Sequence, residues 1–176
     1  MKKIKTTNKQ QEKAPMKDST KILLYSLAGL ILLAIIVLIS IENRSANITV
    51  RNKSDYKLEY IKAYFVDTEG RISEDDIVFE NLESGDKAKL PLDKIDLLYR
   101  EANLELRFKF EDKDEMFVDS GYFNDVFEGQ ISIDFDDIDD DRVNLKVKAS
   151  TGLLPSPYID CNEEHILNLA TGEVEE

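Results

Sequence analysis

Residues 22–41 read ILLYSLAGLILLAIIVLISI, and this stretch decides how the rest of the chain is organised. It contains no charge and no proline, and fourteen of its twenty residues are Leu, Ile or Val. At about 1.5 Å of rise per residue, a helix of this length spans about 30 Å, the thickness of the hydrocarbon core of a bilayer. A core helix of a soluble domain usually keeps a polar stripe, which is missing here. The sequence therefore predicts a single transmembrane helix over residues 22–41.

The residues before the helix, 1–21, are polar and carry seven lysines against two acidic residues. They lack apolar periodicity, so we expect a basic, disordered cytoplasmic tail. The apolar stretch is longer than the roughly 7–15 residues of a cleaved signal peptide, and no A-x-A-like cleavage site follows it, which indicates a signal anchor. The twenty residues after the helix carry only four Lys or Arg. This asymmetry favours a cytoplasmic N-terminus and an extracytoplasmic C-terminal domain in the cell membrane.

The charge of the chain is strongly uneven. The formal net charge is −13, of which residues 1–41 contribute +5, leaving −18 on the remainder. A domain this acidic repels nucleic acid, so we expect no nucleic-acid partner. The single cysteine, Cys161, cannot form a disulfide within the chain, and the domain must be stabilised by its hydrophobic core.

Alternation of apolar and polar residues dominates residues 47–149, which follow a short linker at 42–46. In residues 104–110 every second residue is Leu or Phe, and residues 131–135 and 143–149 show the same pattern. Alternation of this kind is typical of a strand with one buried face. About seven or eight such strands, separated by turn residues, predict an all-β antiparallel sandwich, immunoglobulin-like or similar.

Two segments are harder to interpret. In residues 91–102 the apolar residues fit helical spacing, and either a short helix or an irregular crossover between sheets is compatible with them. Residues 150–176 contain two prolines, several acidic residues and a weakly helical patch. For this second segment we expect a mostly disordered acidic tail, in which Cys161 would be exposed.

An acidic loop at residues 134–141 is the first candidate site. Asp137, Asp139 and Asp141 form the D-x-D-x-D opening of a calcium-binding loop. The later positions that an EF-hand reserves for Gly and Glu hold Arg and Lys, which excludes an EF-hand. A looser Ca²⁺ site stays open, and with it a cation-responsive adhesion or sensor module. The other interpretation is a solvated acidic turn that discourages edge-to-edge aggregation.

Three aromatic residues, Tyr122, Phe123 and Phe127, lie between Gly121 and Gly129. Aromatic side chains in an exposed loop often anchor a binding partner. They can equally fold back over the end of a sandwich and complete its core. The sequence supports these residues as a candidate binding loop without choosing between the two arrangements.

Evidence for catalysis is weak. His165 is the only histidine, which removes most triad and metallohydrolase mechanisms. The S-x-x-K spacing occurs at residues 54–57 and 84–87, but in predicted turns and without the accompanying elements of serine acyl enzymes. A small envelope hydrolase that uses two carboxylates is one further alternative.

The sequence thus favours a single-pass membrane protein with an extracytoplasmic β-sandwich. We expect a non-catalytic binding or accessory module of the cell envelope, with an envelope protein as partner and no cofactor. Tethering a domain to the membrane raises its effective concentration for neighbours, so weak contacts become useful.

Overall fold

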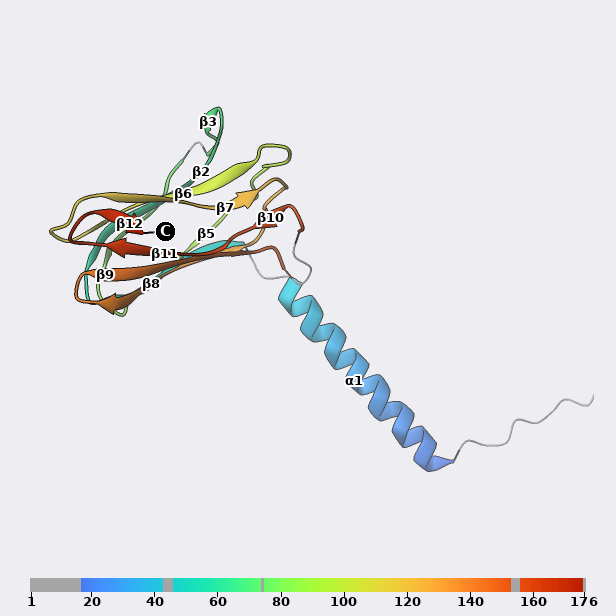
Figure 1. The fold of residues 1–176 in the computed structure, drawn as a ribbon. Coiled ribbons are helices and arrows are strands. Elements are labelled where there is room, and N and C mark those ends of the chain that lie inside the picture. The colour runs from blue at the N-terminus through green and yellow to red at the C-terminus, as the bar shows by residue number, and fades with distance from the viewer. Residues whose placement is uncertain (1–16, 43–45, 74, 153–155, 176) are drawn as a thin grey trace, which may run out of the picture. The chain divides into compact units, whose positions relative to one another are not determined.

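The computed structural model describes residues 17–42, 46–73, 75–152 and 156–175. The chain divides into two compact units, Met1–Ser40 and Ile41–Glu176, and each is described by itself. In the described residues the fold comprises one helix, α1, followed by twelve strands (Figure 1).

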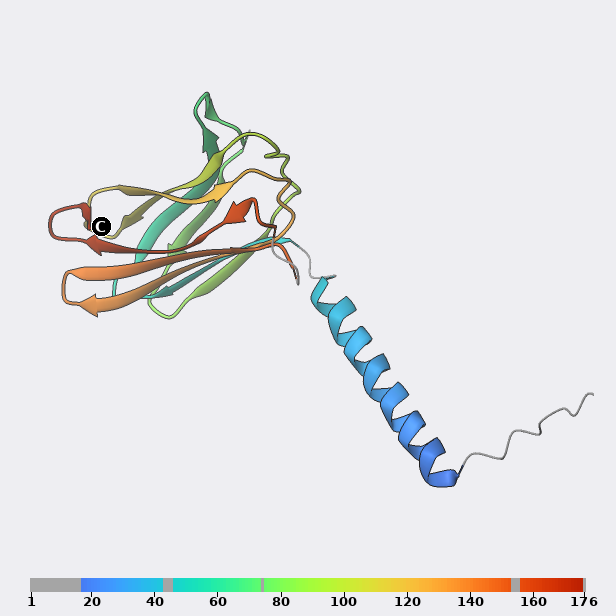
Figure 2. The same ribbon diagram turned by 45° about the vertical axis from the view of Figure 1, so that its right-hand side comes forward.

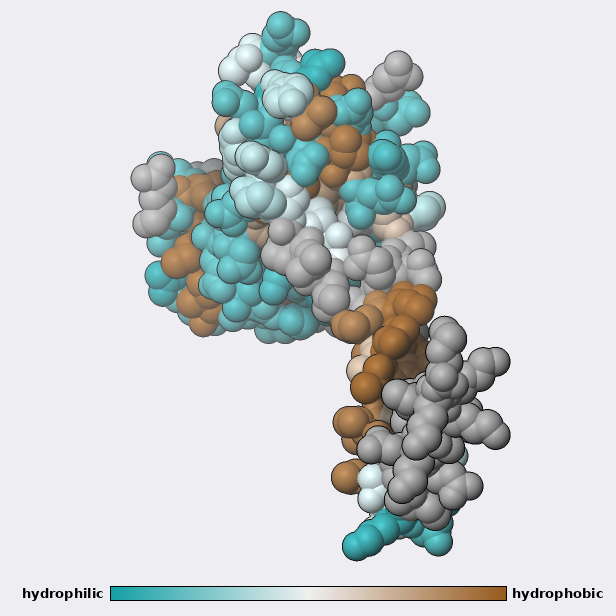
Figure 3. All heavy atoms as spheres, turned by 90° about the vertical axis from the view of Figure 1, so that its right-hand side faces the viewer, coloured by the Kyte–Doolittle hydropathy of each residue, from teal (hydrophilic) through white to brown (hydrophobic). Residues whose placement is uncertain are grey.

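The helix α1 covers Asp18–Glu42. Its apolar window, Asp18–Ile39, has a mean hydropathy of 3.0, and none of that window is buried. Figure 3 shows apolar side chains along the helix and hydrophilic ones at its first turn, where Lys21 Nζ lies 2.8 Å from Asp18 Oδ1. The predicted helix is confirmed, and it is long and apolar enough to span a membrane.

The twelve strands form two sheets, which Figures 1 and 2 show from two directions. Sheet A contains, in spatial order, β12 (Glu173–Glu175), β11 (Asn162–Asn168), β9 (Arg142–Ser150), β8 (Gln130–Asp139), β1 (Asn47–Lys53) and β5 (Lys87–Pro91). Sheet B contains β10 (Ile159–Asp160), β7 (Met116–Phe123), β6 (Ala102–Phe110), β2 (Leu58–Asp67) and β3 (Gly70–Arg71), and β4 (Ile77–Leu82) also pairs with β2.

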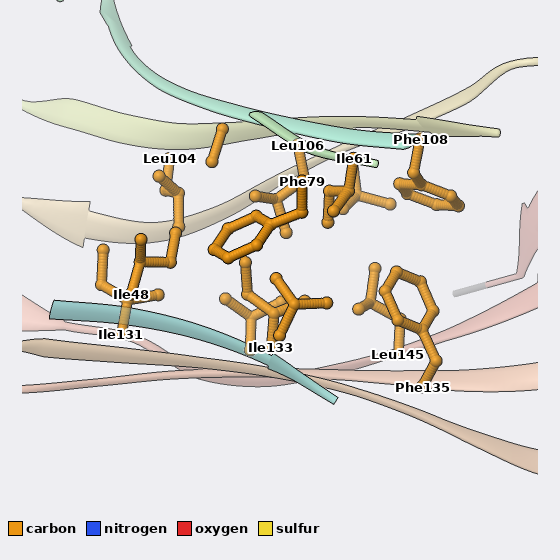
Figure 4. Close-up of a cluster of buried hydrophobic side chains, with 14 of the residues drawn as sticks. Ile48, Ile61, Phe79, Leu104, Leu106, Phe108, Ile131, Ile133, Phe135 and Leu145 are labelled. Carbon is orange, nitrogen blue, oxygen red and sulfur yellow. The ribbon is translucent and has the colours of Figure 1, made fainter. Parts of the chain in front are cut away.

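Apolar side chains from alternate positions fill the space between the sheets (Figure 4). On β6, Leu104, Leu106 and Phe108 are fully buried, whereas the residues between them are not. Phe108 packs edge-to-face on Phe135 of β8, with ring centroids 5.4 Å apart. Burying each such side chain stabilises the fold by about 1.5–3 kcal/mol. The predicted β-sandwich with one preceding helix is therefore confirmed.

One strand pair departs from the predicted antiparallel arrangement. In the described part of the chain, β1 and β8 run parallel, with Asn47 beside Gln130 and Lys53 beside Asp136. Alternation shows which face of a strand is buried, but it carries no information on the direction of the neighbouring strand. The parallel pair could therefore not be predicted from the pattern.

The two ends of the sandwich differ in what they carry. We call the end where β1 begins the entry end and the opposite end the far end. The entry end carries the loops at 68–69, 92–101 and 124–129, together with residues around 151–158 outside the undescribed 153–155. The far end carries the turns at 54–57, 83–86, 111–115, 140–141 and 169–172.

Residues 92–101 form an irregular crossover from β5 to β6, not a helix. Leu92 and Leu97 are buried, and Ile95 exchanges two backbone hydrogen bonds with Phe127. Tyr99 and Glu101 have φ angles of 63° and 51°. This left-handed backbone is incompatible with a continuing α-helix, so the helical spacing of the apolar residues reflects separate contacts with the core.

The C-terminal segment corrects one sequence-based expectation. Where we expected a mostly disordered acidic tail over 150–176, the structure has strands β10, β11 and β12. β11 pairs with β9 along its whole length, from Asn162 beside Lys148 to Asn168 beside Arg142. Leu167 and Leu169 are buried in the core, and Cys161 is only 5% exposed. Burial of these side chains explains why the segment is part of the domain.

Candidate functional sites

The three candidate calcium ligands lie at the far end, at the turn from β8 to β9. Asp137 Oδ2 accepts a hydrogen bond from the backbone N–H of Asp55 at 2.7 Å. Asp139 Oδ2 accepts one from Arg142 Nε at 2.8 Å. Asp141 Oδ1 lies 3.8 Å from Lys113 Nζ. Each carboxylate thus has a partner of its own.

This arrangement does not bring the three carboxylates to one point. Among the described residues, no group of three His, Cys, Asp or Glu side chains could hold a metal ion. A surface hollow of about 440 Å³ is lined by Asp55, Tyr56, Asp137, Asp139 and Asp140. The Arg142 guanidinium lowers the pKa of Asp139, whereas burial raises the pKa of Asp137. The residue chemistry suits calcium, but the geometry is that of separate ion pairs and hydrogen bonds.

The aromatic candidates are mainly core residues. Phe123 and Phe127 are fully buried, and their rings meet edge-to-face with centroids 5.4 Å apart. Phe65 of β2 packs against Phe123 at a centroid distance of 5.0 Å. Tyr122 is 40% exposed, and its hydroxyl accepts a hydrogen bond from Asn124 Nδ2 at 3.0 Å. Of the three residues, only Tyr122 is therefore available to a partner.

A serine and the histidine meet where β7 approaches β11. Ser120 Oγ lies 2.7 Å from His165 Nε2, and Glu163 Oε2 lies 3.5 Å from the same nitrogen. In a catalytic triad the acid holds Nδ1, leaving Nε2 free to activate the serine. Ser120 is also only 1% exposed, so substrate cannot reach its hydroxyl. No sequence pattern indicated that the two side chains would meet, because 45 residues separate them.

The thiol of Cys161 lies beside β7, contrary to our expectation of an exposed residue. Burial, reinforced by the charge of Glu163, raises the pKa of the Cys161 thiol to about 12. Since the thiolate is the reactive form, the folded domain keeps this cysteine inert.

The outer face of sheet B carries a polar network centred on Arg107. Its Nε donates to Glu105 Oε1 at 2.7 Å and to the Tyr64 hydroxyl at 2.8 Å. The guanidinium also lies 5.4 Å from the ring centroid of Phe117, which is 56% exposed. A hydrogen bond to Glu115 raises the pKa of nearby Tyr60 to about 12. The network compensates its charges internally and fixes the side chains of this face.

Two carboxylates on this face bear on the hydrolase alternative. Glu105 and Asp119 lie directly opposite each other on β6 and β7. Burial, followed by the charge of Glu105, raises the pKa of Asp119. A glycosidase needs its two carboxylates on either side of a bound sugar, whereas this pair lies side by side on an open sheet face, with Glu105 already paired to Arg107.

Together, the fold and these sites define an all-β domain joined to one apolar helix that is long enough to span a membrane. Comparisons with protein families, with curated proteins and with solved structures find no match to this chain. Its function is therefore inferred from its own residues.

Proposed function

We propose that this protein is a single-pass membrane protein that holds its β-sandwich outside the cytoplasm as a non-catalytic binding or accessory module of the cell envelope. The observation that carries the proposal is α1, whose window from Asp18 to Ile39 is apolar and wholly unburied. In water such a surface is strongly unfavourable, and in a bilayer it is matched by lipid. The Lys/Arg asymmetry around the helix supports a cytoplasmic N-terminus.

The positions of the possible catalytic groups support a binding role. The buried Ser120–His165 contact has the wrong geometry for a triad, and the Glu105–Asp119 pair lies on an open face. Tethering alone gives such a domain a function, because it confines the domain near the membrane and raises its effective concentration for an envelope protein.

Cysteine labelling tests the sidedness. Cys161 is buried and its thiol pKa is raised, so we expect the parent chain not to react with a maleimide. Ser84→Cys introduces a thiol in an exposed turn between β4 and β5. We expect a membrane-impermeant maleimide to label Ser84→Cys in intact cells. Thr6→Cys, in the N-terminal tail, should react only after permeabilisation.

The reverse pattern of labelling would place the domain in the cytoplasm and contradict the proposal. A cleaved signal sequence is distinguished by fractionation. It would leave the domain in the soluble fraction, shorter by about 40 residues than the full chain. An anchored protein stays at full length in the membrane fraction after alkaline extraction.

A further inference from the structure

The outer face of sheet A carries basic residues in two rows that cross the strands. In one row Lys87 of β5 lies beside Arg51, followed by Asp134 and Lys146 on the next two strands. In the other row Lys89 lies beside Thr49, followed by Ser132 and Lys148. We call this surface the lysine face, and its basic residues are Arg51, Lys53, Lys87, Lys89, Lys146 and Lys148.

The lysine face is rich in basic residues, although the domain as a whole is strongly acidic. In the described part of the chain, the acidic side chains that share strand rows with these six residues are Asp134, Asp136, Glu164 and Glu175, whereas the domain as a whole carries −18. Arg51 pairs with Asp134, Lys53 with Asp136 at 3.0 Å, and Lys146 with Glu164 at 3.6 Å.

Three members of the face have no acidic partner. Within the described ranges, Lys87, Lys89 and Lys148 form no ion pair. These three lysines lie in adjacent rows of one sheet, in a domain with about two acidic residues for each basic one. The arrangement indicates a surface that keeps its positive charge available.

Protection of a sheet edge explains only part of this face. β5 is an edge strand, and Lys87, Lys89 and Pro91 would discourage another chain from pairing with it. Lys146 and Lys148 lie on β9, which is covered on both sides by β8 and β11. Lysines in the interior of a sheet have no edge to protect, so the face requires a second explanation.

At physiological salt, the acidic residues of the far end do not cancel the positive electrostatic potential at the row that contains Lys89 and Lys148. Asp139 lies seven residues along β8 from Ser132, which is about 23 Å at about 3.3 Å per residue. The Debye length at physiological ionic strength is about 8 Å, so the charges of the far-end turns are largely screened at the row of Lys89 and Lys148. A local positive surface can therefore attract an anion although the whole domain is acidic.

We propose that the lysine face binds a linear polymer, not a nucleic acid, whose repeating unit carries a phosphate group. Lysine binds phosphate as a point charge. The two arginines on this side of the sheet, Arg51 and Arg142, could hold a carboxylate or a phosphate through two parallel hydrogen bonds, but they are already paired with Asp134 and Asp139. Lys89 and Lys148 are three strand spacings apart, about 14 Å, so one small anion cannot contact both lysines, whereas one extended polymer chain can. The rows present no aromatic side chain in the described residues on which a base could stack.

This inference rests on the proposed binding role and adds a ligand class to it. The probe is inorganic polyphosphate, and its binding to the full-length chain in detergent micelles is measured over a series of salt concentrations. We expect Lys89→Gln with Lys148→Gln to weaken binding and to lower the slope of log affinity against log salt by about 2, because two fewer phosphates are neutralised by lysine.

The matched control is Lys62→Gln with Lys94→Gln, which removes the same charge. In the described part of the chain, these two lysines also lack ion pairs, and they lie on sheet B and in the crossover at the entry end. We expect this control to retain the parent affinity and salt slope. Circular dichroism melts of both double variants check that each remains folded.

Three results would overturn the inference. An equal loss of affinity in both double variants would show a response to net charge alone. Equal binding of poly-glutamate would remove the preference for phosphate, and binding of anionic lipid vesicles in place of polyphosphate would assign the face to a membrane surface. Polyphosphate binding does not depend on which side of the membrane the domain occupies, so its failure is distinguishable from failure of the topology proposed above.

Discussion

At the scale of single residues, Gly121 shows most directly how the C-terminal segment docks. Its φ is 72°, and a Cβ atom built there would lie 2.5 Å from the Cβ of Cys161. Gly172 has the same φ, but a Cβ there would meet nothing within 4 Å. An alanine at Gly172 would therefore incur only the cost of the left-handed backbone, whereas an alanine at Gly121 would also incur the cost of a steric clash.

We expect Gly172→Ala to lower the free energy of unfolding by about 1–2 kcal/mol, which is the cost of left-handed backbone for a residue with a Cβ. Gly121→Ala should lower it by about 1–3 kcal/mol more, because the added methyl overpacks the contact with Cys161. Urea unfolding followed by circular dichroism measures both values. Equal losses of stability would mean that β10 and β11 shift without cost and that the close contact does not matter.

Calcium is a second question at the residue scale. Asp137, Asp139 and Asp141 each have a separate partner, and a cation would have to replace those contacts while drawing the carboxylates together. A ligand that binds only the folded state must raise the melting temperature. We expect CaCl₂ at about 1 mM, within the range of weak extracellular sites, to leave the melting temperature unchanged relative to MgCl₂. A rise specific to calcium would restore the cation-responsive alternative.

At the scale of elements, the sequence was most informative where one face of a strand is fully apolar. β6 was predicted because Leu and Phe occupy each inward position. β11 was missed because its inward positions include the polar residues Glu163 and His165. They lie where β11 approaches β7, and His165 Nε2 contacts both Glu163 and Ser120. Only Cys161, Leu167 and Leu169 keep the alternation, which is too sparse a signal to identify a strand.

The substitution Leu167→Ala tests whether β11 belongs to the core. Leu167 is completely buried, so we expect its truncation to cost about 2–5 kcal/mol of unfolding free energy. Ile166→Ala is the matched control, because the neighbouring side chain points to the other face and is half-buried. If both variants unfold at the parent urea concentration, the segment contributes little and the expectation of a disordered tail is restored.

The same reasoning explains why sequence could not predict the candidate sites. The lysine face combines residues from β5, β1, β8 and β9, and their order in the sheet is a tertiary property. No spacing within one segment places Lys89 beside Thr49 or Ser132 beside Lys148. By contrast, α1 could be predicted directly, because length and hydropathy are local properties of one segment.

At the scale of the whole molecule, charge balance dominates. The sandwich carries a net charge of −18, and like charges disfavour a compact state. Among carboxylates with a shifted pKa, the value is lowered for Asp67, Glu115, Asp125 and Asp139 and raised for Asp119 and Asp137. The causes of lowering are hydrogen bonds, from the backbone to Asp67 and from Tyr60, Ser156 and Arg142 to the other three.

These shifts determine how stability depends on pH. A carboxyl whose pKa is lowered by folding contributes stability that is present above its unfolded value, here 3.8 for Asp and 4.5 for Glu, and lost as pH falls through the folded value. Asp119 and Asp137 act in the opposite sense: their contribution is present below 3.8 and lost as pH rises through their raised values. Because the first group is larger, we expect the melting temperature to fall as pH drops from about 5 to about 3.

The response to salt distinguishes the loss of hydrogen bonds to carboxylates from repulsion among the negative charges of the domain. At pH 7, raising NaCl to about 0.5 M shortens the Debye length to about 4 Å and screens the excess negative charge, so the melting temperature should rise. As pH falls through the lowered pKa values of Asp67 and Asp139, these groups lose the hydrogen bonds that their charged forms accept in the folded state, and the same salt cannot restore those bonds. Calorimetry of the full-length chain in micelles at about pH 7 and about pH 3 measures the two responses. If the melting temperature instead rises steadily to pH 3, repulsion among the carboxylates outweighs their hydrogen bonds, and the acidic residues of the far end act mainly as a solubilising surface that reduces stability.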